Sequence, residues 1–167
     1  QFQLKLFEEI EKNGIDLGLK YYGNRALMSM RLEKNWGAWT LDFRPDFSVN
    51  ESGLDIFVNW KKNFIGKEYA LKEKERGPKI KLVTMIVDTL DIDVSNDEAI
   101  LKDNKCVGYV TSGGFGHFCK KSIALGYVPI ELSKDQTLLE IEINGNLFKA
   151  HVINKPLYDP SGIKMRK

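Results

Sequence analysis

The stretch LLEIEINGNLFKAHV, residues 138–152, decides how the second half of this chain folds. Two runs rich in leucine, isoleucine, phenylalanine and valine flank Asn144 and Gly145. A two-residue hairpin turn of this kind needs positive φ at both positions, which asparagine and glycine adopt readily. The sequence therefore predicts an antiparallel hairpin made of strands 138–143 and 146–152.

Further β-rich runs precede this hairpin, at residues 80–87, 99–101, 105–111 and 123–128. Asp103 and Asn104 are turn-forming residues and predict a second hairpin. Short strands without a helical pattern between them indicate a small antiparallel barrel or sandwich. The glycine-rich segment 111–116 lacks the phosphate-loop pattern and is predicted to be a turn of this unit.

The first 77 residues have a mainly helical pattern. Leu4, Phe7 and Ile10 lie at three-residue intervals among charged residues, which predicts an amphipathic helix over residues 2–12. Asn24 can cap a second helix over residues 25–35. A third helix is expected to follow residues 64–71.

The third helix should end at Gly77-Pro78, because proline cannot continue a helix. Short strands are expected at residues 17–22 and 53–60, with an irregular loop between residues 36 and 52. The predicted boundary is Gly77-Pro78, with a partial α+β domain at residues 1–77 and an antiparallel β-barrel domain with a tail at residues 78–167. The predicted fold class is α+β.

Composition restricts the function. Lys and Arg number 25 against 23 Asp and Glu, so the net charge of +2 disfavours binding to a nucleic-acid backbone. Cys106 and Cys119 lack metal-binding spacing and are interpreted as reduced thiols, and His117 and His151 as surface or packing residues, so no metal site is predicted. No stretch approaches the roughly 20 apolar residues that span a bilayer, so a membrane is not an expected partner.

Five segments occur in the order found in the glycine-cleavage aminomethyltransferase (T-protein) superfamily. The second predicted helix contains ALMSMRLE, residues 26–33, which resembles the family pattern A-x-x-x-[LM]-R-[LM]-E. The other four are ESGL at residues 51–54, FIGK at 64–67, VGYVTSG at 107–113 and ALGYVP at 124–129. This resemblance implies the latter half of an aminomethyltransferase folate-binding domain followed by a small antiparallel β-barrel.

Two segments are more similar to the demethylating flavoenzymes of this superfamily, the dimethylglycine and sarcosine dehydrogenases or oxidases. They are RLEKNWGAW, residues 31–39, and PLYDP, residues 156–160. A glycine-cleavage-type aminomethyltransferase, or a related folate-dependent methyltransferase without flavin, is the alternative. A non-catalytic binding module is the alternative of another class.

The resemblance implies that FAD oxidises an N-methyl group and that tetrahydrofolate receives the one-carbon unit. The FAD domain and the acid-base aspartate would lie outside this chain, so no catalytic residue is assigned and the chain alone is expected to be inactive. An N-methylated amino acid would be the substrate of the full-length protein. The expected location is bacterial cytoplasm or the mitochondrial matrix.

The resemblance assigns Glu33 as the residue that accepts hydrogen bonds from the pterin ring. Lys62 stands where the family has a cation for the glutamyl tail, and Tyr22 and Trp39 are the candidates for stacking on the ligand rings. Each assignment has a simpler alternative. The alternative for Glu33, a solvated helix residue or an ion-pair partner, is the less favoured interpretation; Lys62 fits a solvated turn as well, and the aromatics fit core residues.

Overall fold

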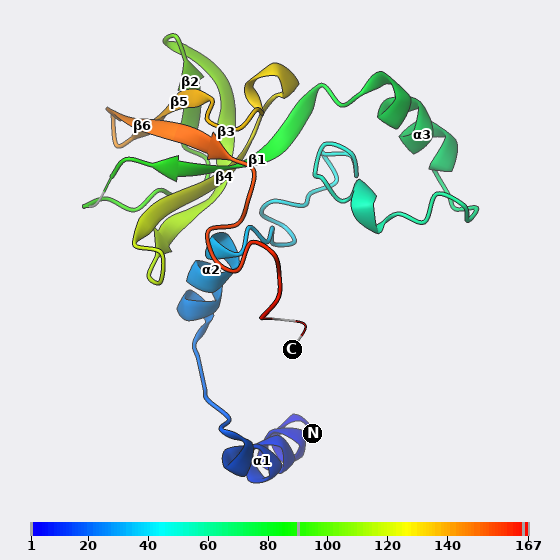
Figure 1. The fold of residues 1–167 in the computed structure, drawn as a ribbon, viewed down its shortest axis with the longest axis vertical. Helices are drawn as coiled ribbons and strands as arrows, with labels where there is room; N and C mark the ends of the chain where they lie inside the picture. The colour runs from blue at the N-terminus through cyan, green and yellow to red at the C-terminus, as the bar shows by residue number, and fades with distance from the viewer. Residues whose placement is uncertain (1, 90, 165, 167) are drawn as a thin grey trace.

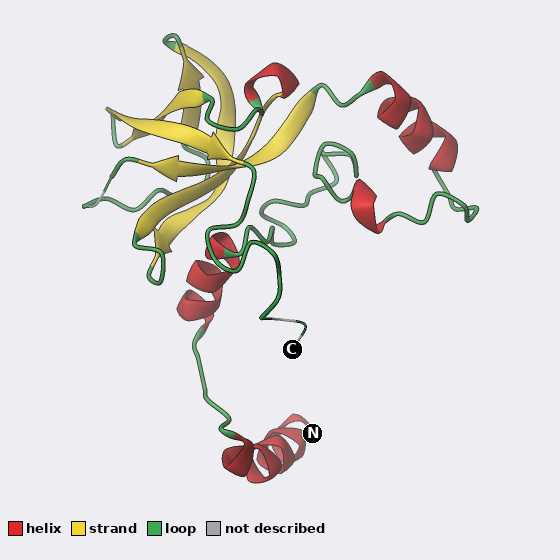
Figure 2. Ribbon diagram, in the orientation of Figure 1, coloured by secondary structure: helices red, strands yellow, loops and turns green. Residues whose placement is uncertain are grey.

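The computed structural model describes residues 2–89, 91–164 and 166 (Figure 1). Its second half is a closed antiparallel barrel with the strand order β1-β4-β3-β2-β5-β6 (Figure 2). The strands are β1 Ile80–Val87, β2 Ala99–Lys102, β3 Lys105–Gly116, β4 Lys121–Pro129, β5 Leu138–Ile143 and β6 Asn146–Ile153. The predicted α+β class with a C-terminal antiparallel barrel is confirmed.

The predicted hairpin of residues 138–152 forms the β5–β6 pair. Ile143 pairs with Asn146, and the turn residues Asn144 and Gly145 have φ values of 50° and 79°. The Asp103-Asn104 turn between β2 and β3 also has positive φ at both residues. Both turns therefore follow from local sequence, because these residues tolerate left-handed backbone at low cost.

Alternate strand residues fill the barrel with apolar side chains. The fully buried members include Met85, Ile100, Val110, Ile141 and Val152, each 0% exposed. Burial of aliphatic side chains of this size stabilises a domain by about 1.5–3 kcal/mol each, so this interior is the main source of stability.

Helix α2, Asn24–Glu33, packs on the outside of the barrel. Its Leu32 forms a second buried cluster with Ile123 and Leu125 of β4. The remaining helices are α1 Gln3–Gly14 and α3 Lys67–Arg76, and short 3-10 turns occur at η1 Ile15–Leu17, η2 Asp55–Phe57 and η3 Ile130–Leu132. Helix α1 has no buried residue and stands apart from the barrel (Figure 1).

Three local predictions are wrong. Residues 17–22 and 53–60 contain no strand: Gly18 turns the chain at φ 79°, and Asp55–Phe57 forms a 3-10 turn. An extended segment needs a hydrogen-bonded neighbour to become a strand, and neither segment has one. Segment 111–116 is not a turn but the end of β3, whose pairing with β4 continues to Gly116 and Lys121.

The helix ends also differ slightly from the prediction. Helix α2 ends at Glu33 because Asn35 has left-handed backbone, with φ 58°. Gly77, with φ 84°, separates α3 from β1. The domain boundary at Gly77-Pro78 stays a prediction. Within the described residues, no helix is long and apolar enough to cross a membrane.

Candidate functional site

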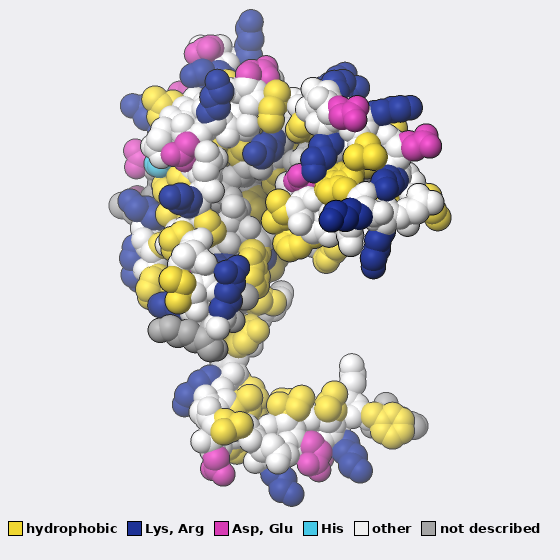
Figure 3. Space-filling model, turned by 45° about the vertical axis from the view of Figure 1, so that its right-hand side comes forward, with side chains coloured by type: hydrophobic (Ala, Val, Ile, Leu, Met, Phe, Trp, Pro, Cys, Tyr) yellow, Lys and Arg dark blue, Asp and Glu magenta, His cyan; other side chains and the backbone are white. Residues whose placement is uncertain are grey.

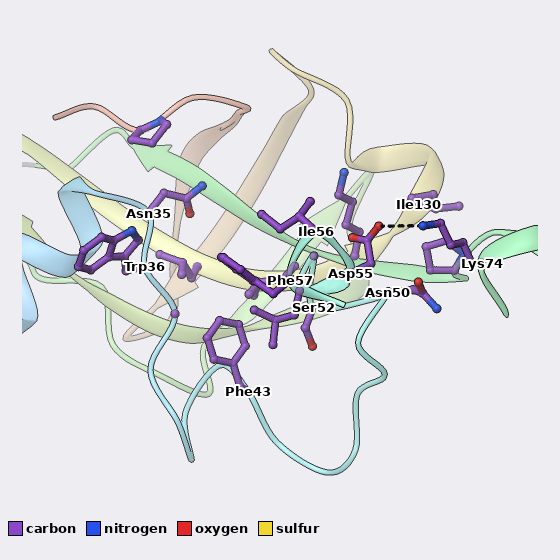
Figure 4. Close-up of a pocket in the computed structure, with 18 of the residues that line it drawn as sticks. Asn35, Trp36, Phe43, Asn50, Ser52, Asp55, Ile56, Phe57, Lys74 and Ile130 are labelled. Carbon is purple, nitrogen blue, oxygen red and sulfur yellow. Dashed lines mark ion pairs between the residues drawn. The ribbon is translucent and has the colours of Figure 1, made fainter. Parts of the chain in front are cut away.

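A groove of about 890 Å³ lies beside the barrel, between strand β1 and the segment that carries η2 and α3. Apolar side chains gather in this hollow (Figure 3), and Figure 4 shows those that line it. The lining residues include Lys34, Asn35, Trp36, Gly37, Phe43, Asp55, Phe57, Lys74 and Lys81.

One wall of the groove is the loop of residues 36–52, which a buried carboxylate holds in place. Asp42 is 0% exposed, and its Oδ2 forms an ion pair with Arg31 Nη1 at 3.0 Å. The same oxygen accepts the Ala38 N–H at 2.7 Å and the Ser112 hydroxyl at 3.0 Å, and Oδ1 accepts the Thr111 hydroxyl at 2.5 Å. A buried charge is tolerated only when it is paired and hydrogen-bonded, and here both conditions hold.

The hydroxyl of Tyr127 secures the same loop from the barrel side. It donates to the Asp42 carbonyl oxygen at 3.0 Å and lies 2.8 Å from Ser52 Oγ. Burial raises the pKa of Tyr127 to about 12, so the hydroxyl stays protonated and can donate near neutral pH. Phe47 stacks on the Tyr127 ring at 3.5 Å between centroids. The loop is therefore fixed to the barrel at several points.

The fixed loop presents Trp36 and Phe43 to the groove. Gly37 is required between them, because a Cβ at this position would lie 2.4 Å from Cζ of Phe43. Asn35 is held at the same end of the groove by the hydroxyl of Thr84, which donates to its side-chain oxygen. This end of the groove combines aromatic surface with an amide group.

Three of the described lysines line the groove. Lys34 Nζ lies 2.9 Å from Asp159 Oδ2 and donates to the Asp159 carbonyl oxygen at 2.6 Å. Lys74 Nζ lies 3.9 Å from Asp55 Oδ2 and 4.3 Å above the Trp60 ring. Lys81, at the start of β1, is exposed and forms no ion pair with any described residue.

Glu33 is buried, with 4% of its surface exposed, and it joins three segments of the chain. Its Oε1 accepts the N–H groups of Phe118 and Cys119, at 2.7 and 2.9 Å. Its carbonyl oxygen accepts the Tyr158 N–H at 2.9 Å. The pKa of the Cys119 thiol is raised, first by burial and then by the hydrogen bond and negative charge of Glu33.

The predicted site residues are not gathered in one place. Glu33 is buried beside the β3–β4 turn, whereas Tyr22, Trp39 and Lys62 are exposed. None of the four lines the groove, although Trp39 lines an adjoining hollow together with Phe43. Their roles toward a ligand stay predictions.

Sequence reasoning missed several groove residues. Trp36 lies in the segment RLEKNWGAW, residues 31–39, so a sequence signal existed for it. Phe57, Lys74 and Lys81 belong to no motif, and only the folding of η2 and α3 beside β1 brings them together. Among the described residues, no group of three or more His, Cys, Asp or Glu is placed to hold a metal ion.

These features define an α+β protein with a closed C-terminal barrel and a candidate groove for a small ligand. Residues 1–62 match the GCVT N-terminal domain, and residues 81–159 match the glycine cleavage T-protein C-terminal barrel domain. The chain therefore belongs to the glycine-cleavage T-protein family, and the predicted resemblance is confirmed.

Two kinds of curated relative are similar to this chain at comparable identity. The mitochondrial dimethylglycine dehydrogenases of Mus musculus and Rattus norvegicus are 36% and 34% identical over 97% of the chain, which spans 19% of their length. The aminomethyltransferase of Acidobacterium capsulatum is 35% identical over 92% of the chain and 41% of its own length. The chain thus spans less than half of these relatives.

A solved structure shares the fold. The glycine cleavage system aminomethyltransferase T from Bartonella henselae has a TM-score of 0.84 with this chain at 24% identity. The match covers 95% of this chain and 44% of that chain. At this identity the similarity establishes the fold.

Proposed function

We propose that this chain is the tetrahydrofolate-binding region of a protein that demethylates an N-methylated glycine, either dimethylglycine or sarcosine. Tetrahydrofolate would receive the one-carbon unit, and FAD, bound elsewhere in the full-length protein, would supply the oxidation. The chain by itself would bind folate weakly at best, and it would not catalyse the reaction, because no catalytic residue is assigned to it.

The observation that carries this choice is the contact between two segments similar to the demethylating flavoenzymes. Lys34, in RLEK, pairs with Asp159, in PLYDP, at 2.9 Å, although 125 residues separate them. The Tyr158 N–H also bonds to the Glu33 carbonyl oxygen. Because the two segments contact each other, they form one structural feature. The 34–36% identity to dimethylglycine dehydrogenases over 97% of the chain supports the same choice.

The groove suits the chemistry of folate. A flat heteroaromatic ring with N–H donors fits a wall formed by Trp36 and Phe43, with the oxygen-bearing side chain of Asn35 close by. The glutamyl carboxylates require cations, and lysines also line the groove. Its volume falls within the usual range of about 300–1,000 Å³ for small-molecule sites.

Glu33 remains a proposed pterin contact, although it does not line the groove itself. Oε1 accepts two backbone N–H groups. Oε2 is therefore the oxygen that a ring N–H would have to reach. Lys62, Tyr22 and Trp39 remain proposed contacts, and their exposure leaves them accessible to a ligand.

Aminomethyl transfer without flavin is the second candidate. It is favoured by the TM-score of 0.84 to an aminomethyltransferase and by 35% identity to the relative from Acidobacterium capsulatum. The folate groove would serve both reactions. Reduction of a bound flavin by dimethylglycine in the full-length gene product would support the first candidate, and aminomethyl transfer without flavin would support the second.

The folate proposal is tested by titrating the chain with tetrahydrofolate under anaerobic conditions while tryptophan fluorescence is recorded. Trp36 lines the groove, so saturable quenching is expected, with much less quenching in Trp36→Phe. Trp60→Phe is the control, because Trp60 does not line the groove. The absence of saturable binding at millimolar ligand, shown independently by calorimetry, would refute the proposal.

A further inference from the structure

We infer that residues 156–164 form a latch that closes over Glu33 and Cys119 and opens while the barrel stays folded. The ion pair between Lys34 and Asp159 is the main polar contact that keeps the latch closed. The latch follows β6 and lies beside the C-terminal end of α2 (Figure 1).

Hydrogen bonds attach the latch to the rest of the molecule at one place. Among the described residues, they reach only Glu33 and Lys34 outside the latch. The Tyr158 N–H donates to the Glu33 carbonyl oxygen at 2.9 Å. Lys34 Nζ donates to the Asp159 carbonyl oxygen at 2.6 Å and to its Oδ2 at 2.9 Å. The two side chains are only 13% and 4% exposed, and charges shielded from water attract each other more strongly than exposed charges do.

Apolar packing under the latch is limited. Leu157 packs against the buried cluster around Leu32, and the Tyr158 ring meets the Phe118 ring edge-on at 4.9 Å between centroids. No residue in the range 156–164 is fully buried, whereas the barrel interior consists of fully buried side chains. Segments with few buried apolar contacts open locally at a lower free-energy cost than core strands. The latch can therefore open without unfolding of the barrel.

The closed latch shields Glu33 and Cys119. Their side chains share one space next to Gly116, where an added Cβ would lie 2.6 Å from Cys119 Sγ and 2.9 Å from Glu33 Oε1. Leu157 packs against the same cluster as Cys119, and the Tyr158 N–H is bonded to Glu33. These contacts place the latch against both residues. Opening of the latch should therefore make the Cys119 thiol more accessible to a reagent.

Where the proposed folate function holds, the latch also limits access to Glu33. A ring N–H would have to reach the carboxylate of a residue that is only 4% exposed while the latch is closed. The apparent affinity of a ligand falls with the fraction of molecules in which its site is accessible. This consequence rests on the proposed function, whereas the latch itself does not.

Amide hydrogen exchange of the unaltered chain, followed by NMR, tests whether the latch opens separately. The Tyr158 N–H should be less protected than the Val152 N–H of β6. Local opening of the latch frees the first amide, whereas the second is bonded to the Thr137 carbonyl oxygen and needs opening of the barrel. Equal protection of the two amides would overturn the inference.

Alkylation of Cys119 by iodoacetamide, in a Cys106→Ser background, tests the role of the ion pair. Asp159→Asn should raise the rate about three- to tenfold, because loss of a charge-assisted hydrogen bond shifts the opening equilibrium toward the open latch. The ratio of rates should be the same at every pH tested, because Glu33, which raises the pKa of the Cys119 thiol, is unchanged.

Ile141→Val in the same background is the control, because it weakens the barrel interior and leaves the contacts of the latch in place. It should not change the alkylation rate. The inference is wrong if Asp159→Asn leaves the rate unchanged, or if Ile141→Val raises it equally. Neither measurement uses tetrahydrofolate, so a failure of the folate proposal would be recognised separately from a failure of the latch.

Discussion

The Glu33 carboxylate accepts the backbone N–H of Cys119 at 2.9 Å, although 86 residues separate the two in the chain. The same oxygen accepts the N–H of Phe118, so one charged side chain of α2 secures the turn between β3 and β4. This contact also places a negative charge beside the Cys119 thiol. It therefore gives Glu33 a measurable structural effect that does not depend on any ligand.

Glu33→Gln should lower the pKa of the Cys119 thiol toward its ordinary value, because Glu33 is the second cause of the upward shift after burial. At a fixed pH near 8 a larger fraction would be thiolate and alkylation by iodoacetamide would be faster. The measurement is the pH dependence of the alkylation rate, made in a Cys106→Ser background.

Glu131→Gln in the same background is the control, since Glu131 is exposed on η3. The midpoint of the pH profile reports the thiol pKa, and this is the quantity that removal of the Glu33 charge should change. Opening of the turn would instead change the plateau rate, because it would make the thiol more accessible. A midpoint that does not move would contradict the proposed coupling.

Asp42→Asn should destabilise the fold by about 3–5 kcal/mol, because it leaves the Arg31 guanidinium buried without its counter-charge. Asp46→Asn, in the same loop, should cost less than about 1 kcal/mol, since the Asp46 side chain is 69% exposed. Urea unfolding monitored by circular dichroism measures both. Equal effects of the two substitutions would show that the buried network is not what holds the loop.

The Lys34–Asp159 pair should make stability depend on pH in the acid range. The pKa of Asp159 lies below its ordinary value of 3.8, chiefly because of the hydrogen bond from Lys34. A lowered folded-state pKa contributes stability that is fully present above 3.8 and is lost as the pH falls through the lowered value.

Asp159→Asn should therefore destabilise the chain at pH 7 and flatten the fall in thermal midpoint between pH 5 and about pH 2. Asp135→Asn provides a comparison, since Asp135 is exposed and forms no ion pair with the described residues. If the thermal midpoint of both variants falls with pH as it does in the unaltered chain, Asp159 is not responsible for that fall.

Gly37→Ala should displace the Phe43 ring from the groove wall, because the added Cβ would lie 2.4 to 2.8 Å from three ring carbons. Overpacking of this kind costs about 1–3 kcal/mol. Gly23→Ala meets no atom within 4 Å and serves as the control. Urea unfolding gives the cost, and a loss of tetrahydrofolate affinity in Gly37→Ala alone would link the wall to binding. Unchanged stability would show that the loop yields without strain.

The sequence predicted the barrel well because its signals are local. The Asn144-Gly145 and Asp103-Asn104 turns require positive φ, and the β-rich runs beside them carry their own pattern. The predicted strands at residues 17–22 and 53–60 did not form, for a different reason. Strand formation depends on a partner, and no β-rich run reveals by itself whether one will be adjacent.

The sequence by itself determined the order of the elements, the family motifs and the presence of Glu33 at the end of α2. Only the tertiary structure decided that the Glu33 carboxylate accepts the N–H groups of Phe118 and Cys119 and that Lys34 pairs with Asp159. It also decided that Lys81 lies in a groove without an ion-pair partner among the described residues. The physical reason is that hydrogen bonds and ion pairs depend on distance in space. The partners of Glu33 and Lys34 are 85 to 125 residues away along the chain, beyond the reach of any local pattern.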